Sequence, residues 1–235
     1  MDLIAVRRQI ERGVNKLSYE FCRAPESILT EYDLRCRLDQ HLRCLAGMRR
    51  PIPSQIQHLP SHRVHHDLPW FDENWKLRIR PDITILDPAR VRIQCSDHSK
   101  IWDPFSGSNQ LYSKTTPLPS KQFEFDGKAI AIELKFARSG ITPAMARLIR
   151  QDFQKMKRLF VILDGRDDGD SVFSYLVIFN RLQQPPWQTP LAKFLTKNKC
   201  GPRHRILYRT WKPLPKWNLR LPGQRRDWSS CVDGN

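Results

Sequence analysis

Residues 129–136 read Ala-Ile-Ala-Ile-Glu-Leu-Lys-Phe, a stretch in which apolar residues alternate first with alanines and then with charged residues. Because side chains alternate across a β-strand, this predicts a strand with one apolar face and one face that is small and then charged. A buried strand is a costly place for an ionised side chain without a partner or a metal. Glu133 and Lys135 therefore mark a candidate site. The apolar face would carry Ile130, Ile132, Leu134 and Phe136, and the other face Ala129, Ala131, Glu133 and Lys135.

A second acidic signal lies earlier in the chain, where Pro81 and Asp82 head the apolar run Ile-Thr-Ile-Leu at 83–86. If this strand and the strand at 129–136 are neighbours, Asp82 and Glu133 can converge on one cation while Lys135 points at the same place. Carboxylate oxygens favour Mg²⁺ or Mn²⁺, and such an ion polarises a scissile phosphate and lowers the pKa of a bound water. The structural alternative is a salt bridge between Lys135 and a carboxylate, without chemistry.

The composition indicates an acidic partner. Forty Lys and Arg against 24 Asp and Glu give the 235-residue chain a net charge of +16. Such a charge favours a polyanion, most simply nucleic acid, over attraction to a membrane surface or plain solubility. No apolar run is long enough to span a membrane, and the N-terminus reaches charged residues too early for a signal peptide. Six cysteines without Cys-x-x-Cys or zinc-ligand spacing favour a reduced, intracellular protein, cytoplasmic or nuclear.

Two helices are predicted before the strands. The first twenty residues are amphipathic, and a second helix begins after Thr30 as N-cap, with Asp33 completing an approximate capping box and Gly47 marking its end. Glu31 lies in the first turn of this helix, where the helix dipole favours a carboxylate whether or not it takes part in chemistry. Cys36 and Cys44 are interpreted as small apolar residues of the same helix.

The remaining elements follow in order. Residues 63–68 and 76–80 are predicted strands, and the second is expected to continue through Pro81 to Leu86. Residues 87–122 lack periodicity and are predicted to be an insertion or long loop. Thr142-Pro143 predicts the start of a helix, and the apolar run 172–179 predicts a central strand.

From Arg181 onward the chain has twelve Lys and Arg against two Asp, with tryptophans interleaved. Basic residues alternating with aromatics can follow a phosphate backbone and stack on unpaired bases, although the tryptophans could equally pack against the core. The candidate nucleic-acid contacts are Arg203, Arg205 and Trp211 in this region, together with Gln151 and Lys155 on the helix after residue 142.

The combination of Pro81-Asp82 with Glu133-Leu134-Lys135, preceded by Thr30-Glu31 on a helix and followed by a helix and an apolar strand, resembles the PD-(D/E)XK nuclease superfamily, the restriction-endonuclease-like group. The resemblance spans residues 28–180 and implies an α/β fold with an αβββαβ core and a mixed central sheet flanked by helices. The first core strand would lie at Val64–Leu68. One departure is that Gln151 is followed four residues later by Lys155, not by the tyrosine of the exonuclease branch.

The resemblance also implies roles for the candidate residues. Asp82, Glu133 and the Leu134 carbonyl would hold Mg²⁺ or Mn²⁺. Lys135 would act on the nucleophilic water. Glu31 would be a further acidic contact, to a second metal or through water.

The expected organisation is an N-terminal helical segment (1–27), a nuclease-like core (28–182) with the insertion at 87–122, and a basic, tryptophan-containing C-terminal extension (183–235). The expected function is that of a metal-dependent endonuclease acting on DNA, as a homodimer or within a larger DNA-processing assembly. Two alternatives remain open: a non-cutting nucleic-acid-binding or assembly subunit with a nuclease-like fold, and a nuclease acting on RNA or single strands.

Overall fold

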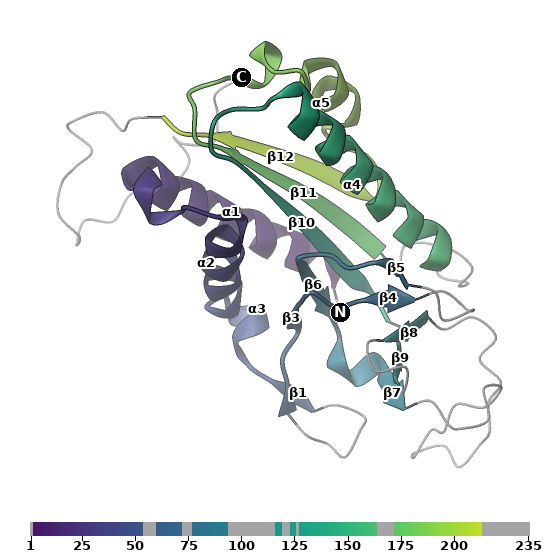
Figure 1. The fold of residues 1–235 in the computed structure, drawn as a ribbon. Helices are drawn as coiled ribbons and strands as arrows, with labels where there is room; N and C mark the ends of the chain where they lie inside the picture. The colour runs from purple at the N-terminus through teal and green to yellow at the C-terminus, as the bar shows by residue number, and fades with distance from the viewer. Residues whose placement is uncertain are drawn as a thin grey trace.

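The computed structural model describes residues 2–53, 60–71, 77–93, 116–118, 123–125, 127–163 and 172–212. A five-stranded mixed sheet forms its centre, with helices on both faces (Figure 1), so the mixed α/β class predicted from the sequence is confirmed. The sheet order is β12-β11-β10-β6-β3. These strands are β3 (Val64–His66), β6 (Ile83–Leu86), β10 (Ala129–Ala137), β11 (Val172–Asn180) and β12 (His204–Thr210).

Strand β10 is the middle of this sheet and has two different edges. On one side it runs parallel to β11 along its whole length, from Ala129↔Val172 to Ala137↔Asn180. On the other side it pairs antiparallel with the shorter β6, and the last pair is Ile132↔Ile83. The second half of β10 therefore extends beyond β6. The neighbour relation expected between the Pro-Asp strand and the Glu-x-Lys strand is confirmed.

Helices α1 (Leu3–Arg23) and α2 (Glu31–Arg43) cover one face of the sheet. The predicted capping box at the start of α2 is confirmed, because Thr30 Oγ accepts the N–H of Asp33 while the Asp33 carboxylate accepts the N–H of Thr30. The turn η1 (Pro25–Ser27) joins the two helices. Buried residues of both helices share one core with the apolar side of β10: Val6, Ile10, Val14, Leu17, Phe21, Leu34, Leu38, Leu42, Ile130, Ile132, Leu134 and Phe136.

The expectation that Gly47 ends α2 was wrong. Gly47 does not terminate the helix but lies inside a further short helix, α3 (Ala46–Arg49). A Cβ at this position would lie 2.7 Å from the amide end of the Gln9 side chain, which is flexible enough to move aside. Cys36 and Cys44, expected as small apolar residues, are exposed free thiols.

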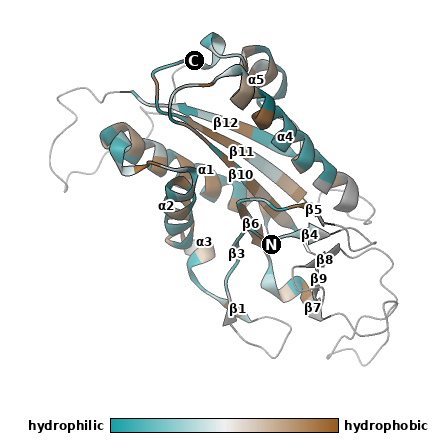
Figure 2. Ribbon diagram, viewed as in Figure 1, coloured by the Kyte–Doolittle hydropathy of each residue, from teal (hydrophilic) through white to brown (hydrophobic). Residues whose placement is uncertain are grey.

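The opposite face of the sheet is covered by α4 (Pro143–Leu163) and α5 (Ala192–Asn198). The predicted start of α4 is confirmed, with Thr142 Oγ accepting the N–H of Met145. Ile149 and Phe153 of α4 pack on Leu176 of β11 and its neighbours. In Figure 2 the hydrophobic residues concentrate in β10 and β11, between the two helical layers. None of the described helices is long and apolar enough to cross a membrane.

The strand predicted to run from 76 to 86 is divided in the structure. β5 (Leu77–Ile79) pairs with β4 (Trp70–Phe71) in a separate small sheet, and only β6 joins the central sheet. Pro81 stands between β5 and β6, and proline has no N–H to donate to a ladder, so the chain leaves one sheet there and enters another.

Part of the region predicted as a loop at 87–122 has regular structure. It contains η2 (Pro88–Arg90), β7 (Val91–Ile93) and β8 (Thr116–Leu118), and both strands pair with β9 (Phe123–Phe125). Residues 94–115 and 119–122 lie outside the described part of the chain. A two-stranded ladder of β1 (Ile52–Pro53) with β2 (Pro60–Ser61) precedes the central strands.

The described part of the C-terminal region contains η3 (Pro186–Gln188), α5 and β12. β12 belongs to the central sheet, because it runs parallel to β11 from Ser174↔His204 to Asn180↔Thr210. Trp217 and Trp228, two of the tryptophans interleaved with basic residues in this region, lie outside the described residues.

Candidate functional site

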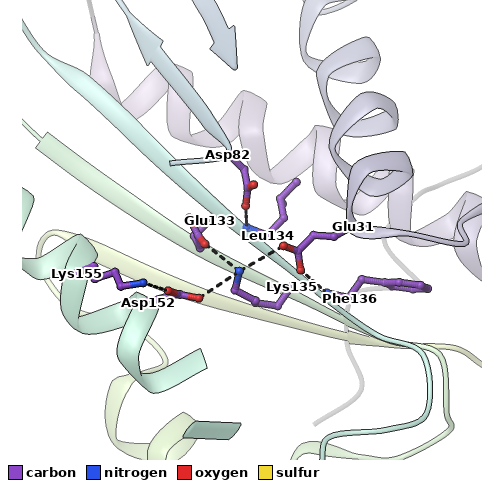
Figure 3. Close-up of polar contacts among 8 residues, drawn as sticks. All are labelled: Glu31, Asp82, Glu133, Leu134, Lys135, Phe136, Asp152 and Lys155. Carbon is purple, nitrogen blue, oxygen red and sulfur yellow. Dashed lines mark hydrogen bonds and ion pairs between the residues drawn. The ribbon is translucent and has the colours of Figure 1, made fainter. Parts of the chain in front are cut away.

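The charged end of β10 is where the predicted site residues meet. Glu133 and Lys135 project from the face that carries Ala129 and Ala131, as the alternation predicts, and the two alanines lie in a cluster with Met156 and Phe160 of α4. Small residues let the helix approach this half of the strand. Figure 3 shows the charged side chains just beyond it, between α2, α4 and the sheet.

Lys135 occupies the centre of a ring of three carboxylates. Its Nζ lies 2.9 Å from Glu133 Oε1, 3.4 Å from Glu31 Oε1 and 3.2 Å from Asp152 Oδ2 (Figure 3). Only 14 % of the Lys135 side chain is exposed. Burial alone would lower the pKa of this amine, but the three carboxylates outweigh it and raise the pKa above its usual range. Lys135 is therefore an ammonium ion held from three elements.

Asp82 and Glu31 take over the edge of β10 that β6 leaves unpaired. The N–H of Leu134 donates to Asp82 Oδ2 at 2.7 Å, and the N–H of Phe136 donates to Glu31 Oε2 at 3.2 Å. In a strand the N–H and C=O of one residue point to the same neighbour, so the Leu134 carbonyl is directed to the same edge as Asp82. The three groups predicted to hold a metal are Asp82, Glu133 and the Leu134 carbonyl. They therefore lie at the same level along β10.

Two carboxylates of this site, Glu133 and Asp82, have raised pKa values. Burial, with a contribution from the Asp82 charge, raises the pKa of Glu133 to about 7, although Lys135 opposes the shift. Burial also raises the pKa of Asp82, against the opposing hydrogen bond from Leu134. Neighbouring carboxylates with raised pKa values are a setting in which a bound cation stabilises the ionised forms.

The donor set fits a hard divalent cation. Asp82, Glu133 and the Leu134 carbonyl supply oxygen only, and Mg²⁺ is commonly held by one or two carboxylates with water and substrate completing its shell. Within the described residues, no group of three or more His, Cys, Asp or Glu side chains is arranged to hold a metal. Glu31, Glu133 and Asp152 all contact the lysine and Asp82 accepts the Leu134 N–H, so an ion between Asp82 and Glu133 would share Glu133 with Lys135.

Asp152 is a site residue that the sequence analysis did not identify. It lies on α4, is 17 % exposed, and bridges Lys135 to Lys155, whose Nζ is 2.8 Å from Asp152 Oδ1. A signal was present in the sequence, because Asp152 is the single acidic residue in Pro143–Leu163. An isolated carboxylate in a strongly basic helix indicates a specific cationic partner.

Arg35 is a second residue near the site that the sequence did not predict. It lies one turn after Glu31 on α2, and its Nη1 is 2.5 Å from Asp67 Oδ2. Asp67 has a φ of 48°, which non-glycine residues rarely adopt, and its N–H donates to the Asp82 carbonyl at 3.2 Å. The Arg35 charge slightly offsets the raised pKa of Asp82, whose main cause is burial.

The predicted nucleic-acid contacts are divided between the two faces of the molecule. Gln151 and Lys155 are exposed on α4, beside the site. Arg205 pairs with Glu11 of α1 at 2.7 Å, on the opposite face, and the Trp211 indole packs against the core that α1 covers. Arg203 precedes β12 and is partly buried. The structure thus brings together Glu31, Asp82, Glu133 and Lys135 but places Arg205 and Trp211 elsewhere.

Comparison with protein-family models, with curated proteins and with solved structures gives no significant match to this chain. The resemblance to PD-(D/E)XK nucleases therefore remains a prediction based on the sequence motifs.

Proposed function

We propose that the chain is a metal-dependent endonuclease with a restriction-endonuclease-like core, hydrolysing phosphodiester bonds in DNA. The observation that supports this most strongly is the position of the Lys135 ammonium, next to Glu133 and on the strand whose edge Asp82 contacts. Two carboxylates that bind a cation, next to a fixed ammonium group, can activate a water molecule for attack on a phosphodiester.

In this proposal each residue has one role. Asp82, Glu133 and the Leu134 carbonyl would hold Mg²⁺ or Mn²⁺, which supplies Lewis acidity toward the phosphate. Lys135 orients the attacking water and favours its hydroxide form through the positive charge of Nζ. Glu31 and Asp152 are positioning residues, because they hold Nζ from opposite sides.

The test is cleavage of supercoiled plasmid in Mg²⁺, Mn²⁺ or Ca²⁺ by the wild type, Asp82→Asn and Lys135→Gln. Each variant should lose at least about 10²-fold in rate, because each removed group acts on the transition state. Glu26→Gln is the matched control, since Glu26 is an exposed carboxylate outside the site. Equal rates in the wild type and both site variants would assign the activity to another site or to a contaminant.

A second candidate function is favoured by the same contacts. The carboxylates already have partners in the fold, namely the Lys135 ammonium and the backbone N–H groups of Leu134 and Phe136. In this alternative the cluster only stabilises a non-cutting nucleic-acid-binding subunit. It predicts salt-dependent binding to nucleic acid that survives Asp82→Asn, and no turnover with any of the three metals.

A further inference from the structure

Helix α4 has a second face that the proposed chemistry does not use. Its buried stripe, which includes Ile149, Phe153 and Met156, packs on the sheet. On its outer side, long polar side chains line an open hollow of ≈ 350 Å³. They lie at helical spacing over three turns, a length of about 16 Å at 1.5 Å per residue. The lining residues are Arg147, Arg150, Gln151, Gln154, Lys155 and Arg158.

The charge of this outer face is uniformly positive. Helix α4 has five Lys and Arg and one acidic residue, Asp152, which is directed to Lys135 and Lys155. Arg150 donates to the Pro190 carbonyl at 2.6 Å, so its guanidinium is anchored. Within the part of the chain that the structure describes, no hydrogen bond or ion pair engages the exposed side chains of Arg147 and Arg158. Cations gathered without counter-charges are repelled by one another unless an anion is present.

Contacts between charged side chains link the hollow to the candidate site. Lys155 lines the hollow and contacts Asp152 at 2.8 Å, and Asp152 contacts Lys135 at 3.2 Å. A chain of alternating charges thus leads from the outer face of α4 to the lysine beside Glu133 (Figure 3). An extended anionic ligand lying along α4 would pass next to this site.

We propose that the outer face of α4 binds the phosphate backbone of a nucleic-acid duplex next to the phosphodiester at the β10 site; the adjacency to a reacting bond rests on the proposed function. Arginine guanidinium groups bind phosphate oxygens in a bidentate manner, and the Gln151 and Gln154 amides add neutral donors. None of the six lining residues is aromatic, so this face offers no aromatic stacking surface for unpaired bases, which favours a duplex. An anionic membrane would require an apolar face on α4, and that face is buried on the sheet.

The test measures binding of a fluorescently labelled DNA duplex by anisotropy in EDTA, at several salt concentrations. Arg147→Gln/Arg158→Gln removes two exposed cations of the hollow and leaves Asp82, Glu133 and Lys135 unchanged. Its matched control is Arg8→Gln/Arg12→Gln, which removes two exposed arginines from α1 on the opposite face of the sheet. We expect the α4 variant to weaken binding about ten-fold or more and to reduce the slope of log affinity against log salt by about 2. The control should change both quantities much less.

A gain-of-function variant guards against an effect on folding. Gln154→Arg adds a cation to the hollow and should tighten binding of the same duplex, with a steeper salt dependence. Equal weakening by the α4 and α1 variants would overturn the proposal, because only net charge would then matter. It would also be overturned if single-stranded DNA of the same sequence, or anionic phospholipid vesicles, depended on Arg147 and Arg158 while the duplex did not.

Binding in EDTA is independent of turnover. If α4-dependent duplex binding is found but plasmid is never cut, the proposed endonuclease activity fails while the binding face on α4 stands. If plasmid is cut but duplex binding does not depend on α4, the proposed binding face fails while the endonuclease activity stands.

Discussion

The backbone N–H of Leu134 donates a 2.7 Å hydrogen bond to Asp82 Oδ2, beyond the last residue pair of the β6–β10 ladder. The Asp82 side chain thus occupies the place of a strand carbonyl, which makes this carboxylate an acceptor for the sheet and, in our proposal, a metal ligand. The two roles can be separated by substitution, because an amide oxygen can replace the acceptor but not the charge.

We expect Asp82→Asn to remain within about 1 kcal/mol of the wild type in free energy of unfolding, while Asp82→Ala loses about 1–3 kcal/mol because the Leu134 N–H is left unsatisfied. Both variants should lose plasmid cleavage. Urea unfolding followed by circular dichroism measures the difference. Equal stability of Asp82→Ala and the wild type would show that the hydrogen bond contributes nothing.

Replacing Lys135 should destabilise the fold, because the cation shared by Glu133, Glu31 and Asp152 is lost. We expect Lys135→Gln to reduce the free energy of unfolding by about 3 kcal/mol near neutral pH, as for other buried ion pairs that lose one partner. Lys128→Gln, at an exposed lysine just before β10, is the matched control and should be nearly neutral. If the two variants unfold at the same urea concentration, the carboxylate ring is not stabilised by Lys135.

The stability of the metal-free protein should depend on pH through Glu133. Its pKa is 4.5 as a free side chain and about 7 in the fold, raised first by burial and then by Asp82. The folded state therefore holds the proton more tightly, so the free energy of unfolding falls as pH rises from 4.5 to 7, by up to about 3 kcal/mol. The raised pKa of Asp82 acts in the same direction.

Glu133→Gln isolates this contribution, because it cannot ionise. The stability of the wild type minus that of the variant, from thermal or urea unfolding in EDTA, should decrease across this pH range. A difference that stays constant with pH would mean that Glu133 titrates normally.

Metal binding should promote the same ionisation. A divalent cation competes with the proton on Glu133, so Ca²⁺ or Mg²⁺ should raise the melting temperature more at a pH above 7 than at a pH near 5. Asp82→Asn should abolish this metal-dependent increase. Differential scanning calorimetry measures it without any need for turnover. An equal increase in Asp82→Asn and the wild type would place the ion elsewhere.

Asp152 should act on turnover through Lys135. We expect Asp152→Asn to lower kcat about ten-fold and to change KM little, because it weakens the hold on Nζ rather than the contact with substrate. Asp152→Glu, which keeps the charge, should recover part of the loss. A rise in KM with unchanged kcat would instead place Asp152 in substrate binding.

Local signals were enough for much of the secondary structure. The capping box of Thr30 and Asp33, the Thr142-Pro143 helix start and the alternation in 129–136 each depend on residues only a few positions apart, and the structure confirms all three. The same alternation correctly placed Glu133 and Lys135 on one face, since the geometry of a strand allows no other arrangement.

Strand pairings between distant segments were harder to predict from the sequence. Residues 76–86 were predicted as one strand although Pro81 separates β5 from β6, because a proline in the sequence does not reveal whether the chain continues in the same sheet. The place of β12 beside β11 depends on parallel pairing across residues 181–203, and no local pattern encodes it.

Eight consecutive residues were therefore enough to predict Glu133 and Lys135 as site residues, whereas Asp152 and Arg35 were not predicted. Asp152 reaches Lys135 only because the buried stripe of α4 packs on the sheet, and Arg35 reaches Asp67 only because α2 packs on the other face. The local chemistry of the site is a property of the strand. The number of carboxylates that share its lysine, and the raised pKa of Glu133, arise from packing, because burial and distant charges act through space rather than along the chain.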